Sequence, residues 1–408
     1  MDFKLLYIAS FFFVTISCSE NKTPTDLTTL VQPFGIIPSS QNGYGGGLDQ
    51  LAQPDDVEIL SNGSFLVTDV DNNRIQLFSS DGSLLKSVSA KHLQLPNQNI
   101  IPTGVATDGD GFIYVSLEGV GRIARFTSEL IFDQFIGRPC SVSAENYYRT
   151  ENDGCLISPQ GLIVAKNGDV YVIDMAKNVF MKNEVRNFGF RKFYQSTKSN
   201  KTVYQYDRGF AQSQEITTIM RKSEGMTISP DQKTLYLAEE KPQKSQFGNL
   251  KKMRYIAAFD LETGRFLNRL FGVSVKNDSI VEGVFKKAVE GICVFEKYLF
   301  AVDEKGGKVV VFDLRSGSHL GSIGRLAYYY CNKESDCVID GVNYNEQNII
   351  AGRAMPHLKN DWRKNEMASP DGISAITLDD GSRILAVVDQ WNSRILLYDL
   401  SKILRNFD

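Results

Sequence analysis

Short apolar runs of about five residues, each ending at polar turn residues, recur along nearly the whole chain. The clearest copy begins at Pro54, continues through residues 57–60, 65–69 and 75–78, and ends at Asp81-Gly82. Asn-Gly and Asp-Gly dipeptides in such turns adopt the positive φ angles that tight hairpins need. No long window shows the i, i+3, i+4 spacing of an amphipathic helix. The pattern therefore predicts an all-β chain built from repeated units with strands A to D.

Related copies of this unit begin at Gly104, Gly161, Gly225, Gly291 and Gly372. A repeat of about 40–50 residues made of short strands is typical of a β-propeller. A β-sandwich is the alternative architecture, but it does not explain the regular repeat. We therefore expect a six-bladed β-propeller, in which the same end of every blade faces one central channel.

The last copy contains only three strand runs before the chain nearly ends, at residues 373–378, 384–389 and 395–400. Residues 29–35 (TLVQPFG) resemble the D strands of other copies, such as residues 266–272. We expect this N-terminal segment to complete the last blade, because closure removes an exposed sheet edge. Residues 28–408 would then form a single propeller domain.

The N-terminus has the pattern of an export signal. Lys4 precedes an apolar run at residues 5–16, which is too short to span a bilayer comfortably. Residues 15–18 (TISC) resemble a bacterial lipobox with Cys18 as the lipidated residue, and plain secretion with cleavage nearby is the alternative. We predict an export signal at residues 1–18 and a polar linker at residues 19–27. The protein would be an extracytoplasmic bacterial lipoprotein, periplasmic or anchored to the outer membrane, and attached to the membrane by its lipid.

The cysteines agree with export. Cys140 and Cys155 flank one inter-blade loop, and Cys331 and Cys337 lie within another. Exported proteins can keep disulfides, and pairing within each loop is the simplest of the three arrangements. We predict the bridges Cys140–Cys155 and Cys331–Cys337. A metal site is the alternative, but four cysteines in two distant loops lack a CxxC spacing.

Composition excludes several function classes. The chain has 45 Lys and Arg against 48 Asp and Glu, and the net charge of −3 predicts no general affinity for nucleic acid. The three histidines are scattered without a zinc-hydrolase motif, and neither a GxSxG elbow nor a phosphate-binding loop is present.

Acidic residues occupy many positions at one predicted mouth of the channel. Strands A and B form a hairpin, so the start of A and the end of B lie at the same mouth. The acidic residues at these positions are Asp55, Asp56, Asp69, Glu118, Asp174, Glu224, Glu239, Glu240, Glu290, Asp303, Glu304, Asp371 and Asp389. Packed carboxylates repel one another unless a cation neutralises them, and Ca²⁺ prefers six to eight oxygen ligands. We expect a Ca²⁺ site here, with Asp56 and Asp371 among its ligands, unless these acids are ordinary turn residues.

Long basic insertions are predicted at the same mouth. The candidate substrate-binding residues are Lys241, Lys251, Lys252 and Arg254 in one insertion, and Arg186 and Arg191 in another. Long loops on one face of a rigid scaffold commonly bind ligands. Basic loops above an acidic, metal-binding floor favour an anionic small molecule such as a phosphate ester. Solvated loops without a ligand are the alternative.

Two propeller families share motifs with this chain. Residues 53–85 (QPDDVEILSNGSFLVTDVDNNRIQLFSSDGSLL) and 369–399 (SPDGISAITLDDGSRILAVVDQWNSRILLYD) resemble NHL repeats, which occur in both enzymes and binding modules. Residues 223–240 (SEGMTISPDQKTLYLAEE), followed by VEGI at 289–292 and DGI at 371–373, are similar to β-propeller phytases. The second resemblance implies calcium ligands at Glu224, Glu240 and Glu290. It departs from the family at Ala288, where phytases have Asp, and their phosphate-gripping Lys and Arg find no match.

The sequence therefore predicts an exported, lipid-anchored propeller that acts as a calcium-dependent, phytase-like phosphomonoesterase. The main alternative is a non-catalytic NHL-like module that binds a protein or glycan partner through its looped face. A lactonase-like enzyme with one metal ion is a third hypothesis. It needs an Asn and Asp pair around one Glu, which the sequence does not reveal.

Overall fold

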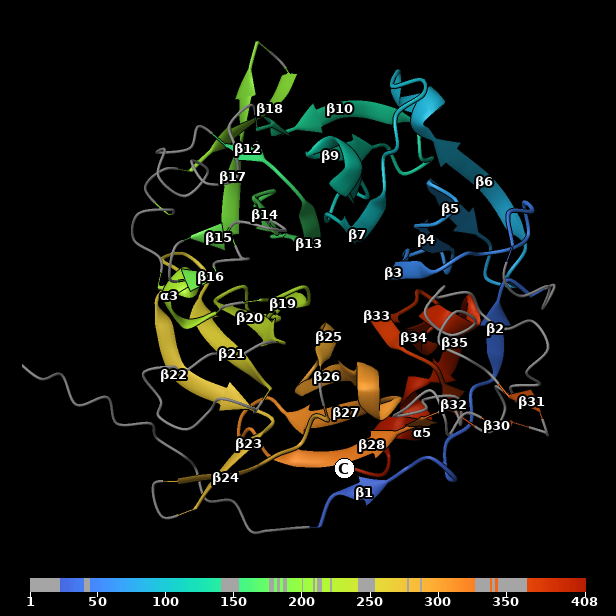
Figure 1. The fold of residues 1–408 in the computed structure, drawn as a ribbon, viewed down its shortest axis with the longest axis vertical. Helices are drawn as coiled ribbons and strands as arrows, with labels where there is room; N and C mark the ends of the chain where they lie inside the picture. The colour runs from blue at the N-terminus through green and yellow to red at the C-terminus, as the bar shows by residue number, and fades with distance from the viewer. Residues whose placement is uncertain are drawn as a thin grey trace, which may run out of the picture.

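The computed structural model describes residues 23–39, 45–140, 154–175, 180–181, 184–185, 189–199, 201–207, 210, 215–220, 222–240, 254–276, 279–286, 288–326, 338–339, 342–343 and 365–408. Six antiparallel sheets are arranged around one axis, with the first strand of each sheet innermost (Figure 1). The predicted six-bladed β-propeller is confirmed. Within the described residues, no helix is long and apolar enough to cross a membrane.

Each blade has the predicted A-to-D order. Blades one to three are β3 (Pro54–Ile59), β4 (Phe65–Asp69), β5 (Arg74–Phe78) and β6 (Leu84–Ser89); β7 (Pro102–Thr107), β8 (Ile113–Leu117), β9 (Arg122–Phe126) and β10 (Phe132–Ile136); and β13 (Pro159–Val164), β14 (Val170–Asp174), β17 (Gly189–Lys198) and β18 (Lys201–Tyr206). Blades four to six are β19 (Met226–Ile228), β20 (Thr234–Glu239), β21 (Tyr255–Asp260) and β22 (Phe266–Phe271); β25 (Val289–Phe295), β26 (Tyr298–Asp303), β27 (Lys308–Asp313) and β28 (His319–Ile323); and β33 (Pro370–Thr377), β34 (Arg383–Asp389), β35 (Arg394–Asp399) and β2 (Gly35–Ile37).

Short elements connect and decorate the blades. The two-stranded pairs are β11 (Arg138–Pro139) with β12 (Cys155–Leu156), β15 (Phe180–Met181) with β16 (Glu184–Val185), β23 (Val273–Lys276) with β24 (Ser279–Gly283), β29 (Arg325–Leu326) with β32 (Glu366–Met367), and β30 (Val338–Ile339) with β31 (Val342–Asn343). The helical segments are η1 (Ala90–Leu93), η2 (Glu118–Val120), α3 (Ile216–Ile219), η3 (Glu304–Gly306), η6 (Gln390–Asn392) and α5 (Leu400–Leu404).

An N-terminal strand closes the last blade, as expected, but its bounds differ from the prediction. The closing strand β2 pairs antiparallel with β35, whereas the expected strand covered residues 29–35. Residues 27–31 form a turn, in which Val31 N donates to Leu27 O at 2.9 Å, and Pro33 has no N–H to give to a sheet. Before this turn, β1 (Thr25–Asp26) pairs parallel with β28 at the outer edge of blade five (Figure 1). The N-terminal segment therefore joins blades five and six, and β1 lies inside the expected linker.

The glycines that open the repeats allow the inner strands to approach closely. A Cβ at Gly161 would lie 2.0 Å from the carbonyl oxygen of Glu224, and one at Gly225 would lie 1.9 Å from that of Glu290. A Cβ at Gly104 would lie 2.7 Å from the carbonyl oxygen of Gln160 in the next blade, and one at Gly291 would lie 2.5 Å from that of Asp371. No side chain fits such gaps, so these four positions require glycine.

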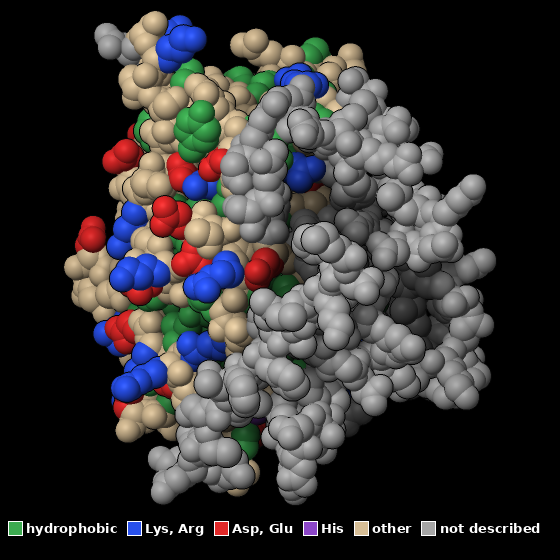
Figure 2. All heavy atoms as spheres, turned by 90° about the vertical axis from the view of Figure 1, so that its left-hand side faces the viewer, with side chains coloured by type: hydrophobic (Ala, Val, Ile, Leu, Met, Phe, Trp, Pro, Cys, Tyr) green, Lys and Arg blue, Asp and Glu red, His purple; other side chains and the backbone are tan. Residues whose placement is uncertain are grey.

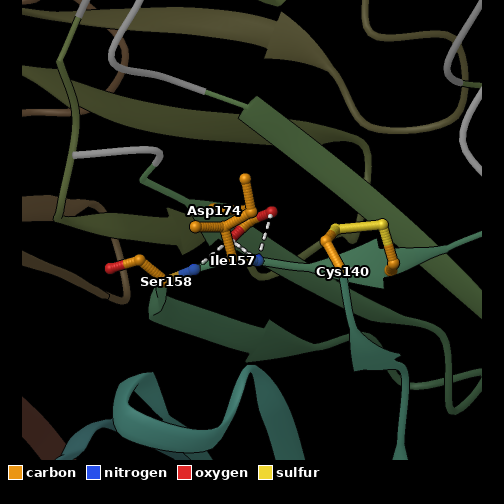
Figure 3. Close-up of a disulfide and its surroundings, with 5 residues drawn as sticks. Cys140, Ile157, Ser158 and Asp174 are labelled. Atoms are coloured by element: carbon orange, nitrogen blue, oxygen red, sulfur yellow. Dashed lines mark hydrogen bonds between the residues drawn. A yellow bond between two sulfur atoms is a disulfide. The ribbon is translucent and has the colours of Figure 1, made fainter. Parts of the chain in front are cut away.

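One predicted disulfide is confirmed. Cys140 and Cys155 are bonded with an S–S distance of 2.05 Å, next to the parallel pair of β11 and β12 (Figure 3). The bridge closes the loop that leads from blade two into blade three. Cys331 and Cys337 lie outside the described residues.

Candidate cation site at the mouth of the channel

The inner strands line a central cavity of about 730 Å³. At one mouth, equivalent positions just before or at the start of the six inner strands carry Asp55, Thr103, Gln160, Glu224, Glu290 and Asp371. The acidic members come from four neighbouring blades, from blade four through blade one, whereas blades two and three contribute neutral side chains. At these six positions, the negative charge therefore lies on one side of the mouth.

The acids that end strand B have a structural role in four blades. Asp69 accepts hydrogen bonds from Ala52 N and Arg74 Nε, both at 2.7 Å, and Asp389 accepts from Ala368 N and Arg394 Nε at the same distance. In the same way, Asp174 accepts from Ile157 N and Ser158 N (Figure 3), and Asp303 accepts from Lys286 N and Gly306 N. We call Asp69, Asp174, Asp303 and Asp389 the clamp acids. Each fastens the loop entering its blade to the end of the second strand, so the turn-residue alternative holds for them.

The clamp acids also explain the NHL-like motif. In DVDNNR, Asn72 Nδ2 and Arg74 Nε both donate to Asp69 Oδ2. In DQWNSR, Asn392 and Arg394 do the same to Asp389 Oδ2. The resemblance of blades one and six to NHL repeats therefore reflects a device for fixing a loop.

Glu224, Glu240 and Glu290 form a separate cluster, which we call the mouth triad. Each offers a carboxylate oxygen, and these three atoms lie within 4.8 Å of one another. Glu240 and Glu290 are buried, with exposed fractions of 4% and 7%. Glu240 Oε1 and Glu290 Oε2 find no hydrogen-bond partner among the described residues. A hard cation would supply the missing partner, so the residues present fit a divalent metal ion.

Lys222 completes this cluster, and the sequence analysis missed it. Its Nζ lies 2.9 Å from Glu224 Oε1 and directly contacts Glu240 Oε2. Lys222 N also donates to Glu239 Oε1, the contact that clamp acids make in other blades. The donor precedes the acid by 17 positions here and for Asp69, Asp174 and Asp303. That spacing is the sequence signal that could have located Lys222 beside the triad.

Burial and mutual repulsion shift the pKa values of the triad. Burial, followed by the charge of Glu224, raises the pKa of Glu240 to about 7, although Lys222 opposes the shift. Burial and the charges of Glu224 and Glu240 raise the pKa of Glu290 well above its usual value. Burial alone would lower the pKa of Lys222, but the three carboxylates outweigh it and raise that pKa. Burial and mutual repulsion therefore make it costly to keep all three carboxylates charged beside a single ammonium group.

The two other predicted metal ligands lie outside the triad. Asp56 occupies the glycine position of the repeat in blade one, where its carboxylate accepts from Val57 N and Val105 N, both at 2.9 Å. It thereby ties blade one to blade two, and burial raises its pKa to about 7. Asp371 is partly buried at the mouth and accepts a hydrogen bond from Gln390 Nε2 at 2.9 Å. Burial, and then repulsion from Asp55, raises the pKa of Asp371 well above its usual value.

The predicted substrate-binding residues are not brought together in the described structure. Lys241, Lys251, Lys252 and Arg186 lie outside the described residues. Arg191 is buried on β17, where its Nη1 donates to Phe190 O at 3.3 Å. Arg254 is partly buried just before β21. Among the described residues that line the central cavity, neither arginine is present.

No protein-family model and no curated protein sequence matches the chain. Solved structures with a similar fold include a gluconolactonase from Xanthomonas campestris, with 15% identity, a TM-score of 0.48, and coverage of 86% of this chain and 87% of that one. They also include regucalcin, a calcium-binding protein from Agrobacterium tumefaciens, with 9% identity, a TM-score of 0.47, and coverage of 90% and 95%. Virginiamycin B lyase from Staphylococcus aureus has 15% identity, a TM-score of 0.44, and coverage of 86% and 96%.

These neighbours single out neither NHL modules nor phytases. At such low identities and TM-scores they support no inference about activity. The order and pairing of the strands establish the conclusion by themselves: the chain is a six-bladed β-propeller.

Proposed function

We propose that this propeller is a calcium-dependent hydrolase of phosphate monoesters, with the ion held by Glu224, Glu240 and Glu290. One observation carries the proposal: two buried carboxylate oxygens of the triad find no hydrogen-bond partner among the described residues. An unsatisfied buried carboxylate is costly, and a metal ion is the ligand best matched to several of them. We further propose export and lipid attachment through Cys18, on the basis of the N-terminal sequence.

The chemistry divides between the ion and the residues around it. A divalent ion supplies Lewis acidity toward phosphoryl oxygens and lowers the pKa of a bound water. Glu240 and Glu290 are buried and anchor the site, while the Glu224 side chain is 29% exposed and faces the incoming ligand. Thr103 and Gln160 are neutral at the inner-strand positions of blades two and three, so an anionic group meets less repulsion from these positions than from the acidic ones.

Calcium binding and turnover are tested in that order. Ca²⁺ at 100 times its Kd should stabilise the full chain by about 2.7 kcal/mol, because it binds only the folded state. A panel of phosphate monoesters, assayed with Ca²⁺ and with a chelator, should then show hydrolysis only with Ca²⁺. Calcium binding without turnover on any ester would refute the phosphatase activity and leave the metal site intact.

Lys222 favours a second candidate, a non-catalytic binding module. Its ammonium already neutralises part of the triad, so the cluster can serve as a structural floor beneath a protein- or glycan-binding face. On the side of the molecule that Figure 2 shows, positive and negative side chains of the described residues are interspersed, which suits a mixed polar partner better than nucleic acid. This candidate predicts partner capture that is unaffected by a chelator.

A further inference from the structure

Lys222 lies where a bound cation would lie. Its ammonium contacts two of the three triad carboxylates, at 2.9 Å from Glu224 Oε1 and directly against Glu240 Oε2. A calcium ion needs carboxylate oxygens at about 2.3–2.6 Å, so an ion shared by these same oxygens would overlap the ammonium group. The triad spans only 4.8 Å between its oxygen atoms. The cluster therefore has room for one cation at a time.

The lysine is anchored by its backbone independently of its side-chain contacts. Lys222 N donates to Glu239 Oε1 at 3.2 Å, and Lys222 O accepts from Glu240 N at 3.0 Å. The side chain is 19% exposed, and its four-carbon stem is flexible. The ammonium can therefore turn toward the open mouth while the loop that carries it stays fixed.

The arginines of the clamp acids are held more firmly. Arg74 donates through Nε to Asp69 and through Nη2 to the carbonyl oxygens of Gly47 and Gln50, at 2.7 and 2.8 Å. Arg394 likewise joins Asp389 to Glu366 O. Each clamp acid also accepts a backbone N–H, so its charge is compensated by several fixed donors. Lys222 instead shares its single charge between Glu224 and Glu240, and Glu240 still has an oxygen without a hydrogen-bond partner among the described residues.

We propose that Lys222 is an internal counter-ion of the mouth triad, and that a divalent cation binds this site only by displacing the Lys222 ammonium. The exchange replaces one positive charge by two at the same oxygens, which favours divalent over monovalent cations. Lys222 thus sets the affinity of the site. This inference rests on the proposed metal site, but it makes its own prediction about the residue that opposes metal binding.

The test is a calcium titration of the full chain and its variants by calorimetry, with Tb³⁺ luminescence as a second probe. Lys222→Met removes the competing charge and should lower the Kd for Ca²⁺ by ~tenfold or more. Lys222→Arg keeps the charge and should retain weak binding. Lys286→Met is the matched control, because Lys286 N makes the equivalent contact to Asp303 while its side chain is exposed. That control should leave the Kd unchanged.

Each outcome decides the proposal. Tighter Ca²⁺ binding in Lys222→Met, without a change in Lys286→Met, supports displacement. If Lys222→Met binds Ca²⁺ and the wild type does not, the proposed native function fails and the inference stands. Calcium binding to wild type that is unchanged or weaker in Lys222→Met overturns the inference and leaves the proposed function intact. Absence of binding in both proteins overturns both. If Lys222→Met does not fold, Lys222→Gln keeps a hydrogen-bond donor toward the carboxylates and should give the same change in Kd.

Discussion

The clamp acids and the mouth triad are the same kind of side chain at the same end of the blades, yet their surroundings are opposite. Asp69 and Asp389 are each saturated by a backbone N–H, an Asn amide and an Arg guanidinium. Lys222 forms an ion pair with Glu240 but not with Glu290 among the described residues, and both glutamates keep an oxygen without a hydrogen-bond partner in the described structure. A carboxylate with fixed donors holds the fold together, whereas a buried carboxylate without them is available to a ligand.

The longer side chain of Glu is part of this difference. A clamp acid must reach only the loop immediately before its own blade, and Asp is long enough to do so. Glu224, Glu240 and Glu290 come from two neighbouring blades and must meet above the channel. The extra methylene carries their carboxylates away from the local N–H groups and toward one another.

The largest effect should come from breaking a clamp. Asp389→Asn leaves the Arg394 guanidinium buried without its charge partner, since the two side chains are 0% and 10% exposed. Removing one partner of a buried pair typically destabilises by about 3–5 kcal/mol. Chemical unfolding of the variant should show a loss of that order. Asp380→Asn, on an exposed turn where Asp380 accepts from Ser382, should change stability little.

That result bears on the comparison directly. If Asp389→Asn unfolds at the same denaturant concentration as wild type, the clamp acids are no more structural than the triad. The distinction between the two groups would then rest on hydrogen-bond counts alone.

A smaller effect of opposite sign should follow from neutralising the triad. Glu290→Gln removes a buried charge whose pKa is raised well above normal, and its new amide can donate to the partnerless oxygen of Glu240. We therefore expect this variant to have a higher free energy of unfolding than wild type at pH 8 without metal. The same variant should lose most of the Ca²⁺-induced rise in melting temperature.

The outcome decides whether Glu290 is a metal ligand or a structural residue. A destabilised Glu290→Gln protein that still responds fully to Ca²⁺ would mean that Glu290 is a clamp rather than a ligand. Thermal melting with and without Ca²⁺ at one pH is sufficient to decide.

The sequence pattern predicted those features of the molecule that depend on residues close together in the chain. The repeat gave the six blades, the motifs around Glu224, Glu240 and Glu290 predicted that these side chains meet, and loop position predicted the Cys140–Cys155 bridge. The strand that closes the last blade was expected in the right segment but with the wrong bounds, because the turn at residues 27–31 depends on packing against blade five.

Contacts that form only in the folded structure determined which predicted site residues meet, and the sequence pattern did not reveal these contacts. Asp56 looked like a mouth ligand, but its oxygens are occupied by Val57 N and Val105 N from two different blades. Lys222 lies one residue outside the recognisable motif, and its meeting with Glu224 and Glu240 depends on the shape of the loop between blades three and four. Sequence identifies the charges, but only the fold shows which of them are already satisfied.

The smallest predicted effect concerns an acid deeper in the channel. Its hydrogen bonding is intermediate between that of the clamp acids, which have fixed donors, and that of the mouth triad, which has oxygens without partners among the described residues. Glu58 is a partly buried acid that accepts hydrogen bonds from the hydroxyl groups of Thr107 and Ser374, at 2.9 and 3.0 Å. Hydroxyl groups can rotate, so Glu58 is satisfied without being fixed in its charged form. Burial raises its pKa above the usual 4.5 despite these bonds.

A raised pKa means that the folded chain binds this proton more tightly than the unfolded chain. The contribution of Glu58 to stability is therefore present below about pH 4.5 and is lost as pH rises through the folded-state pKa. Glu58→Gln keeps the shape, and the two hydroxyls can rotate to accept from the amide. The free energy of unfolding of this variant should fall less steeply than that of wild type above pH 4.5. Glu129→Gln, at an exposed acid, should follow the wild-type curve above pH 5. Parallel curves for wild type and Glu58→Gln would show that hydroxyl donors hold a buried carboxylate as well as the backbone N–H groups of the clamps do.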